Sequence, residues 1–416
     1  MMTTLPDTGL PRDEILGALR AMSADDFSWQ DGRLSAYAFA SGQAAEQTAR
    51  DAFFQHFSVN ALGARRAFPG LRRMEAEVVA IGLQLLRAPA GAAGFMTTGG
   101  TESILAAVRA SRNAARARLG QPGHRGNIVA PATAHPAFTK AADLMDLEVR
   151  RVAVGNDYRS DAGAMAAAID RDTIMLVGSA PCFPYGVVDR VDELSELALA
   201  RGAWLHVDAC VGGYIAPFAR MLGHPVPDFD LGLPGVRSIS ADLHKFGYCP
   251  KPASTVFYRC AEDARHQAFE YDDWPSGRYA TDTVVGTRPG AAVAAAWAML
   301  HAMGRQGYLD STRRVLDLAA RYRQRYAASP GLRIVGQPHL SLMAVTADDV
   351  DLHRVGECLK QRGWLPGMIR EPQGLHHMLS LLHETAVEPY FRDFAECLQA
   401  VRSARGPATG KIEVLY

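Results

Sequence analysis

Short apolar runs alternate with longer helical repeats along the chain from residue 93 to residue 260. Seven short runs, several of them enriched in β-branched residues, have the length of buried strands. They are Gly94–Thr97, Ile128–Ala130, Glu148–Val152, Ile174–Gly178, Trp204–Val207, Val236–Ser240 and Ser254–Tyr258. Helical patterns lie between them, at Glu102–Leu119, Phe138–Leu144, Ala162–Ile169 and Glu193–Ala200. Because strands separated by helices need crossover connections, this order predicts a mostly parallel, doubly wound α/β sheet.

The pattern changes after Pro289 to long amphipathic helices and a few strands. The predicted elements are helices at Ala291–Met303 and Asp310–Ala328, strands at Leu332–Val335 and Leu340–Val345, and a helix at Val350–Arg362. We therefore predict a large domain at residues 61–290 and a small C-terminal α+β domain at residues 291–416, preceded by an N-terminal segment at residues 1–60. Ligands of a doubly wound sheet bind at the carboxyl ends of its strands, so the large domain is expected to hold the site.

Composition narrows the kind of partner. The 416 residues carry 44 basic and 44 acidic side chains, so the net charge is zero and gives no pull towards nucleic acid or an anionic membrane. The longest apolar stretches, Val78–Leu86 and Ala291–Leu300, are about half of the ~20 residues that a membrane span needs. The start, Met1–Leu16, has prolines and acids where a signal peptide needs basic and then apolar residues. We expect a cytoplasmic protein that binds small molecules and copies of itself.

The six cysteines are spread along the chain without a C-x-x-C pair. They are Cys182, Cys210, Cys249, Cys260, Cys358 and Cys397. Such spacing is more typical of reduced thiols than of a disulfide framework or a zinc site. No metal site is predicted.

A glycine-rich turn follows the first predicted strand. The stretch Phe95-Met96-Thr97-Thr98-Gly99-Gly100-Thr101-Glu102-Ser103 runs from an apolar strand through small residues into a helix. It exposes backbone N–H groups and hydroxyls at the positive end of that helix, which suits a phosphate. Taken alone, the match fits equally well a structural turn in which Thr101 caps the helix.

Two further candidates follow later strands. Asp208 comes at the end of an apolar strand, where a carboxylate can keep a pyridine nitrogen protonated, although a satisfied core or capping Asp is the plainer interpretation. Lys245 lies beyond another strand, among small, aromatic and polar residues. Desolvation there prepares a lysine to form an imine, although most lysines are solvated surface charges. A phosphate turn, a strand-end Asp and then a lysine is the order used by fold type I pyridoxal 5′-phosphate enzymes.

Five longer stretches carry a family pattern. They are residues 68–77 (FPGLRRMEAE), 98–104 (TGGTESI), 134–138 (AHPAF), 206–213 (HVDACVGG) and 238–251 (SISADLHKFGYCPK). In this order they resemble the sphingosine-1-phosphate lyases, within the group II pyridoxal-dependent decarboxylase superfamily. The resemblance runs from about Trp29 to the last helix. It implies a fold type I enzyme with pyridoxal 5′-phosphate as its cofactor.

The resemblance also implies roles for particular residues. Lys245 would carry the cofactor as a Schiff base and later move a proton, Asp208 would bind the pyridine nitrogen, and His135 would stack on the ring. A lone histidine at a helix start is more often a cap or a satisfied core residue, so this role comes from the resemblance alone.

The remaining cofactor contacts concern the phosphate. Gly99, Gly100 and Thr101 would bind it, and His244 would adjoin it. Thr287 would reach the phosphate of the neighbouring subunit, which makes a homodimer part of the expectation.

The substrate site departs from the family pattern in the N-terminal segment, which we expect to contribute to the active site. Phe39 stands where the family has a tyrosine that helps to hold the substrate phosphate, and a phenyl ring cannot donate that hydrogen bond. In the family's Asn-x-Leu-His motif, Asn60 is kept but Gly63 replaces the histidine.

Four basic residues offer other anion contacts. Lys251 matches a second family lysine for the substrate phosphate, although it also suits an exposed loop. Arg65 and Arg66 follow Gly63 in a loop that is one residue longer, and surface solvation is the plainer interpretation of both. Arg288 is a further candidate for a substrate carboxylate. We therefore expect long-chain phosphorylated sphingoid bases to be poor substrates, and a different small amine to be preferred.

The expected reaction is cleavage of a carbon–carbon bond. The closest resemblance favours a retro-aldol cleavage that releases an aldehyde. Amino-acid decarboxylation is the alternative on the same fold, because the same cofactor residues serve both reactions. A non-catalytic pyridoxal-binding protein is disfavoured, since Lys245, Asp208 and His135 are all present.

Overall fold

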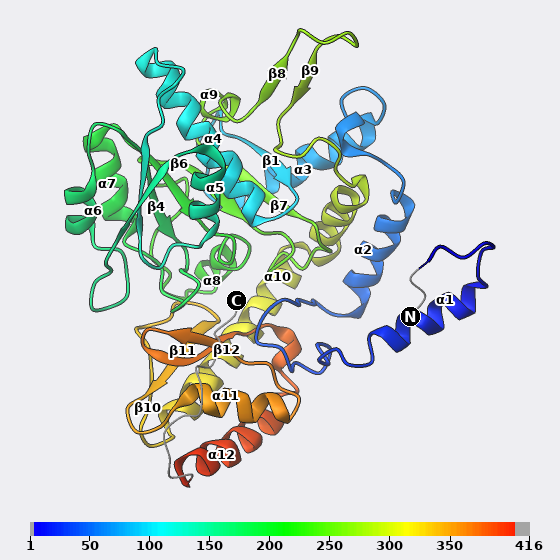
Figure 1. The fold of residues 1–416 in the computed structure, drawn as a ribbon, viewed down its shortest axis with the longest axis vertical. Helices are drawn as coiled ribbons and strands as arrows, with labels where there is room; N and C mark the ends of the chain where they lie inside the picture. The colour runs from blue at the N-terminus through cyan, green and yellow to red at the C-terminus, as the bar shows by residue number, and fades with distance from the viewer. Residues whose placement is uncertain (1–3, 404–416) are drawn as a thin grey trace.

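The large part of the molecule is built on a twisted, mostly parallel sheet. The computed structural model describes residues 4–403, and within them seven strands form this sheet in the order β1-β7-β6-β5-β4-β2-β3 (Figure 1). The strands are β1 Ala93–Thr97, β2 Asn127–Pro131, β3 Glu148–Val152, β4 Thr173–Ser179, β5 Trp204–Asp208, β6 Val236–Ala241 and β7 Ser254–Tyr258. All seven strands predicted from the sequence are confirmed, with ends that shift by at most one residue. The predicted α/β fold class is confirmed as well.

Both faces of the sheet are covered by helices. Those of the large part are α3 Pro69–Leu85, α4 Gly100–Leu119, α5 Ala137–Met145, α6 Ala162–Ala168, α7 Val191–Arg201, α8 Ala216–Met221 and α9 Ala261–Arg265. Alternate residues of one strand enter different cores: Trp204 packs in the cluster of α4 and α5, whereas Leu205 and Val207 pack in the cluster of α3, α7 and α8. Because side chains of a strand alternate between faces, Asp208 points to the same face as Trp204.

The strands that matter for the site end at one edge. Strands β2, β4, β5 and β6 run parallel to one another. Strands β1 and β6 are both antiparallel to β7, so β1 runs in the same direction as β6. The carboxyl ends of these five strands therefore meet at one edge of the sheet, where a doubly wound fold places its ligand.

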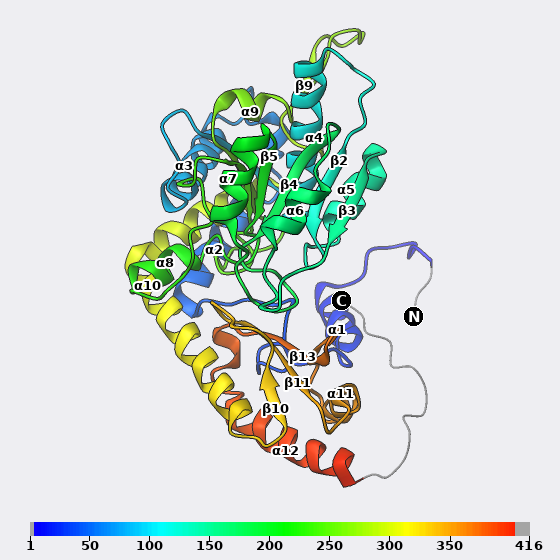
Figure 2. The same ribbon diagram turned by 90° about the vertical axis from the view of Figure 1, so that its left-hand side faces the viewer.

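A long helix, α10 Gly290–Ala327, connects the large part to a smaller one (Figure 2). The two helices predicted on either side of residue 304 form one element that is kinked at Gly304, whose φ is 55°. Among the described residues, four strands form the small antiparallel sheet in the order β10-β11-β13-β12. The elements that follow α10 are β10 Leu332–Ile334, β11 Leu342–Ala347, α11 Leu352–Gln361, β12 Gly367–Arg370, β13 Gln373–Met378, η2 Leu381–His383 and α12 Val387–Ser403.

The N-terminal segment joins the two parts. It contains α1 Arg12–Met22, α2 Gln43–Gln55 and the short helix η1 Ala61–Gly63. Backbone hydrogen bonds tie Ser35 to Leu365 and Met378 of the small part, and α2 packs along α10. A separate hairpin, β8 Phe269–Tyr271 and β9 Tyr279–Thr281, extends from the large part (Figure 1). The side chains of Tyr271 and Trp274 in this hairpin are exposed.

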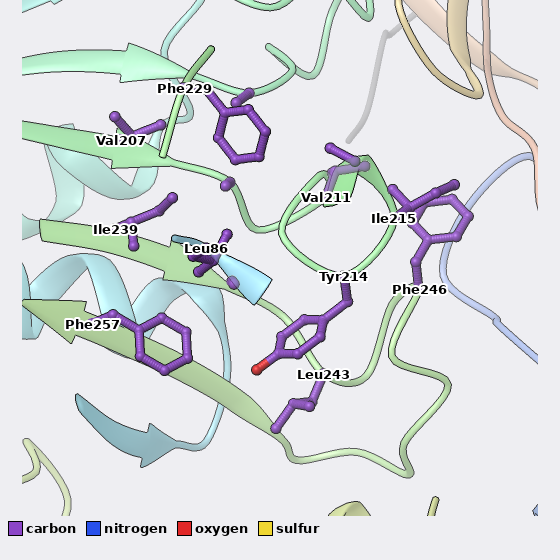
Figure 3. Close-up of a cluster of buried hydrophobic side chains, with 14 of the residues drawn as sticks. Leu86, Val207, Val211, Tyr214, Ile215, Phe229, Ile239, Leu243, Phe246 and Phe257 are labelled. Carbon is purple, nitrogen blue, oxygen red and sulfur yellow. The ribbon is translucent and has the colours of Figure 1, made fainter. Parts of the chain in front are cut away.

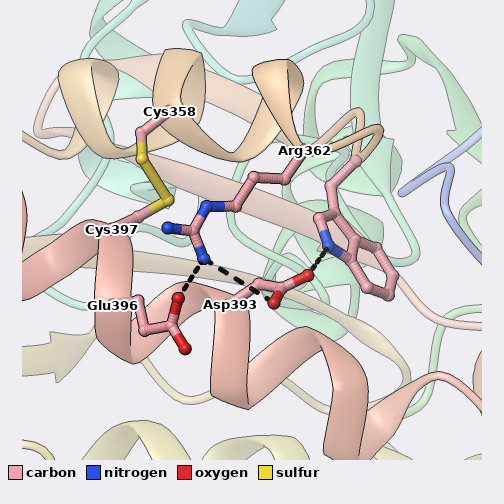
Figure 4. Close-up of a disulfide and its surroundings, with 6 residues drawn as sticks. Cys358, Arg362, Asp393, Glu396 and Cys397 are labelled. Atoms are coloured by element: carbon pink, nitrogen blue, oxygen red, sulfur yellow. Dashed lines mark hydrogen bonds and ion pairs between the residues drawn. A yellow bond between two sulfur atoms is a disulfide. The ribbon is translucent and has the colours of Figure 1, made fainter.

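The prediction of reduced thiols is wrong for two cysteines. Cys358 on α11 and Cys397 on α12 form a disulfide, with Cα atoms 5.7 Å apart (Figure 4). The two residues are 39 positions apart in the sequence, so no short cysteine spacing predicts the pair. The packing of α11 against α12 brings them together. The other four described cysteines are free.

None of the helices within residues 4–403 combines the length and the apolar character needed to cross a bilayer. The same part of the chain holds no grouping of three or more His, Cys, Asp or Glu side chains suited to a metal ion.

Candidate active site

A cavity of about 410 Å³ lies where the five strand ends meet. Its walls come from segments that are far apart in the sequence, namely the β1–α4 turn, the loop before α5, the ends of β4 and β5, and the turn after β6. The lining residues are Thr98, Gly99, Gly100, Thr101, Glu102, Ile104, His135, Ser179, Pro181, Phe183, Asp208, Cys210, Val211, Asp242, His244 and Lys245. Seven of the residues singled out from the sequence thus share one cavity.

The glycine turn forms one wall at the N-terminus of α4. This helix is 20 residues long, so its first turn presents free N–H groups and a partial positive charge to the cavity. Glu102 fixes the turn, because its carboxylate accepts hydrogen bonds from the backbone N–H (2.6 Å) and the hydroxyl (2.7 Å) of Thr98. A Cβ atom on Gly100 would lie only 2.7 Å from the Sγ of Cys210. Only glycine lets the helix start approach the opposite wall this closely.

Asp208 lies at the carboxyl end of β5 and is 8% exposed. One carboxylate oxygen accepts the backbone N–H of Cys210 at 3.0 Å and lies 3.4 Å from the hydroxyl of Ser240. Its neighbour two positions earlier, His206, is a satisfied core histidine that bonds to Ser238 and packs on Phe138. The strand therefore points one histidine into the core and one carboxylate into the cavity.

His135 lies in the loop between β2 and α5. Its Nδ1 accepts the backbone N–H of Ala137 at 3.1 Å, so the proton of the neutral ring is assigned to Nε2. Burial, helped by the charges of Lys245 and Arg151, lowers the pKa of His135 below its usual value. The loop is held by Arg151, which donates to the carbonyl oxygens of Ala132 and Ala134. A neutral, fixed ring therefore faces the cavity.

Lys245 is carried by a tight turn after β6. Leu243 and Phe246, on either side of it in the sequence, are 0% and 1% exposed and anchor the turn in the core (Figure 3). The Lys245 side chain reaches the cavity and is 18% exposed. Its Nζ lies 3.0 Å from a carboxylate oxygen of Asp242.

His244 lies beside the same carboxylate. Its Nε2 is 3.6 Å from Asp242, and its Nδ1 faces the backbone N–H of Ala253 at 3.4 Å. Burial lowers the pKa of His244 although Asp242 acts in the opposite direction. Sequence reasoning missed Asp242 and Glu102. The available signals were the position of Asp242 three residues before Lys245 and the position of Glu102 in the first turn of α4.

The substrate candidates lie elsewhere. Phe39 packs edge-to-face on Phe246, with ring centroids 5.1 Å apart. Asn60 donates from Nδ2 to the hydroxyl of Thr287 at 3.2 Å. Partial burial and the charge of Lys245 lower the pKa of Lys251.

Two arginines are occupied by ion pairs. Arg288 is 3.2 Å from Glu75 and donates to the carbonyl oxygen of Met96, and Arg65 pairs with Asp282. Both line a separate cavity of about 400 Å³. Neither Arg288 nor Thr287 is among the described residues that line the cavity of Lys245.

A larger cavity of about 740 Å³ adjoins the first one, and His135 and Phe183 line both. It lies between the N-terminal segment, the large part and the small part. Its lining is mainly apolar, with aromatic residues such as Tyr37 and Tyr185, and it also includes the charged residues Arg151, Glu357, Lys360, Arg370 and Glu371. The cavity of Lys245 is the more polar of the two.

Comparison with known proteins identifies the family. Residues 27–347 match the pyridoxal-dependent decarboxylase conserved domain. The chain belongs to this family. It is 35% identical to the sphingosine-1-phosphate lyase of Oryza sativa over 100% of this chain and 78% of that protein. It is 32% identical to a probable L-aspartate decarboxylase of Pyrococcus abyssi, over 96% of this chain and 100% of that protein.

A solved structure agrees with these relatives. The sphingosine-1-phosphate lyase of Burkholderia pseudomallei superposes with a TM-score of 0.92 at 37% identity, covering 97% of this chain and 94% of that one. The chain is therefore a pyridoxal phosphate-dependent lyase, and the resemblance inferred from the five sequence stretches is confirmed.

The cavity fits pyridoxal phosphate. Two of its buried lining atoms, Ser179 Oγ and Asp242 Oδ1, have no hydrogen-bond partner among the described residues, which suits a polar ligand. Helix N–H groups at Gly100 and Thr101 match a phosphate, the Asp208 carboxylate matches a pyridinium, and the Lys245 amine matches an aldehyde.

Proposed function

We propose that the protein is a retro-aldol lyase that releases an aldehyde and uses Lys245 to bind its cofactor. One observation carries the role of the cofactor: a single cavity gathers Lys245, Asp208 and His135 against a glycine turn at the start of α4. This set has an amine, a carboxylate, an aromatic face and a phosphate cradle, each at a different wall. The similarity to sphingosine-1-phosphate lyases favours the retro-aldol reaction over decarboxylation.

Bound pyridoxal phosphate would supply an electron sink for the carbon that bears the substrate amine. Asp208, fixed by the Cys210 N–H, keeps the pyridine nitrogen protonated. The neutral ring of His135 covers one face of the cofactor. Lys245 holds the cofactor between turnovers and afterwards moves a proton at its Nζ.

The cofactor phosphate would lie against the glycine turn at the start of α4, where polar groups gather. Gly99, Gly100 and Thr101 donate through their backbone, and Thr101 adds a hydroxyl. His244 adjoins them, since its ring lies 3.7 Å from the Cβ position of Gly99.

The proposed functional unit is a homodimer. Thr287 does not line the Lys245 cavity of its own chain. Asn60 Nδ2 donates to the hydroxyl of Thr287 at 3.2 Å and so orients it. We propose that this hydroxyl binds the phosphate in the partner's site. The cytoplasmic location expected from the sequence stays a prediction.

The proposed substrate is a small β-hydroxy amine. Its amine would lie at Lys245, and the rest of the molecule would pass His135 and Phe183 towards the larger cavity. Phe39 and Gly63 supply neither of the two contacts expected for a substrate phosphate, whereas Asn60 and Lys251 keep their family identity. Arg288 is held by Glu75, which weakens the earlier expectation that it binds a substrate carboxylate.

The name of the Pyrococcus relative keeps decarboxylation as the second candidate. Product analysis separates the two reactions: β-hydroxy amines and acidic amino acids are incubated with the purified enzyme, and released aldehyde and carbon dioxide are measured together. The proposal predicts an aldehyde and a shorter amine in equal amounts. Carbon dioxide without aldehyde would replace retro-aldol cleavage by decarboxylation.

A further inference from the structure

A second carboxylate lies beside the reactive lysine. Asp242 is 3% exposed, and one of its oxygens is 3.0 Å from the Nζ of Lys245 and 3.6 Å from the Nε2 of His244. Its other oxygen, Oδ1, is buried without a hydrogen-bond partner among the described residues. The carboxylate therefore directs one oxygen at the amine of Lys245, and the other oxygen lies buried beside Gly100.

The position of this carboxylate is fixed from several sides. The backbone N–H of Asp242 donates to the carbonyl oxygen of Cys210 at 3.2 Å, which attaches the start of the turn to the segment after β5. Both carboxylate oxygens lie 3.0 Å from the Cβ position of Gly100, at the positive N-terminus of α4. Asp242 thus cannot move away from Lys245 without disturbing the first turn of α4 or the end of β5.

Burial of a carboxylate is costly unless a cation compensates it. Burial alone would raise the pKa of Asp242, but the charges of Lys245 and His244, together with hydrogen bonds to the carboxylate, outweigh it, so the pKa of Asp242 falls below its usual value. Asp242 is therefore ionised, and Lys245 is the nearer of its two basic partners.

The two carboxylates of the cavity have different partners. Asp208 bonds to the Cys210 N–H and points from the end of β5, whereas Asp242 belongs to the same turn as Lys245, three residues before it. Because both Asp242 and Lys245 are carried by one short turn, their distance is set locally.

We propose that Asp242 is a positioning residue for Lys245. Its carboxylate holds the Lys245 ammonium within the cavity whenever the lysine is not attached to the cofactor. The ion pair keeps both the amine and the proton that it moves at the site, and the ammonium gives up this proton before the amine binds the cofactor again. The inference rests on the proposed role of Lys245. It gives a function to Asp242, which is not the proposed partner of the pyridine nitrogen and whose negative charge does not attract the phosphate.

The proposal is tested by titrating Lys245 in the full-length protein after removal of the cofactor. The rate of modification by an amine-reactive reagent is measured against pH, and the peptide that contains Lys245 is quantified by mass spectrometry. An opposite charge within about 4–6 Å shifts a pKa by about 1–3 units, so Asp242→Asn is expected to lower the apparent pKa of Lys245 by at least about one unit. Circular dichroism checks the fold.

Asp230→Asn is the matched control. Asp230 is also fully buried and paired with Arg87 and Arg220, but it is not among the described residues of the Lys245 cavity. This variant is expected to lose stability and leave the titration of Lys245 unchanged. If Asp242→Asn does not fold, Asp242→Ser removes the same charge with a smaller side chain and carries the same prediction.

A folded Asp242 variant in which Lys245 titrates as in the wild type would overturn the proposal. In the holoenzyme, the variant should also lower kcat more than it raises KM, because substrate contacts are intact. Borohydride reduction separates this outcome from a failure of the proposed function: cofactor found on another lysine would refute the role of Lys245, whereas cofactor on Lys245 with an unchanged titration would refute only the role of Asp242.

Discussion

The Cβ position of Gly100 lies 3.0 Å from both carboxylate oxygens of Asp242. The start of α4 and the turn that carries Lys245 are thus packed against each other with no room for a methyl group. This contact joins the proposed phosphate end of the cavity to its reactive amine.

Gly100→Ala should therefore weaken cofactor binding. Overpacking costs about 1–3 kcal/mol, which corresponds to roughly a 5- to 150-fold loss of affinity if the cofactor-bound form carries the strain. Gly99→Ala is the matched comparison, because its new Cβ would lie 3.7 Å from His244, an ordinary contact. Equilibrium titration of each cofactor-free variant with pyridoxal phosphate measures its affinity for the cofactor. Equal affinities of the two variants would contradict the close approach at Gly100.

Asp208→Asn tests the electrostatic role of the strand-end carboxylate. The amide keeps the size and the hydrogen bond from Cys210 but cannot hold a proton on the pyridine nitrogen. Loss of a preorganised electrostatic contact costs on the order of 10²-fold or more in kcat. Cofactor content, measured by absorbance, should stay close to that of the wild type. Near-normal turnover would remove Asp208 from this role.

The sequence predicted the large sheet well because its strands are short apolar runs between helices. It also predicted that the glycine turn, Asp208 and Lys245 follow strands, and a parallel sheet brings such positions to one edge. The antiparallel orientation of β7 gave no comparable signal. Strands β12 and β13 were not predicted, since Gly367–Arg370 and Gln373–Met378 contain glycine, histidine and polar residues that mask the alternation of apolar and polar positions.

Contacts between distant segments were beyond the sequence. The Cys358–Cys397 disulfide depends on two helices packing side by side, and beside it Arg362 pairs with Glu396 and lies 3.7 Å from Asp393 (Figure 4). The capture of Arg288 by Glu75 likewise depends on where α3 meets the start of α10. The sequence tells which side chains are charged, but only the packing of distant segments decides which residue each of them pairs with.

Stability should fall with acid between about pH 6.5 and pH 4, partly because of His376. Burial lowers the pKa of His376 to about 4, and its Nε2 is 2.8 Å from the carbonyl oxygen of Phe183. The unfolded state takes up the proton at about pH 6.5 and the folded state only near pH 4, so folding loses free energy as pH falls through this window. One such histidine contributes roughly 3 kcal/mol over the window.

His376→Gln keeps a donor for Phe183 but does not titrate. Urea unfolding at pH 7 and at pH 4.5 should show a smaller difference for this variant than for the wild type. An identical pH dependence in the two proteins would show that His376 is not buried in its neutral form.

Long-chain sphingoid phosphates should be poor substrates. A hydrogen bond to a charged group is worth about 1.5–3 kcal/mol. If Phe39 and Gly63 stand at the two phosphate-binding positions that the family resemblance implies, the two missing contacts correspond to a loss of roughly 10²–10⁴-fold in kcat/KM. Arg65 is not expected to compensate, because it lines a different cavity and pairs with Asp282 there. Phe39→Tyr should raise kcat/KM for the phosphorylated base and leave that for its unphosphorylated form unchanged.

The double variant Phe39→Tyr, Gly63→His extends this test. A Cβ at Gly63 would lie 3.2 Å from the ring of Phe68, so a small shift of that ring is needed, and the single variant remains the cleaner comparison. Efficient cleavage of the sphingoid phosphate by the unmodified enzyme would refute the altered substrate site.

Reduction of the purified enzyme with borohydride, followed by peptide mass spectrometry, tests the central claim most directly. The visible absorbance of the lysine-bound cofactor should disappear, and the reduced cofactor should be found on the peptide that contains Lys245. Lys245→Ala should show neither the absorbance nor turnover, while Lys251→Ala should keep the absorbance. Reduced cofactor on Lys251 or on any other lysine would contradict the account.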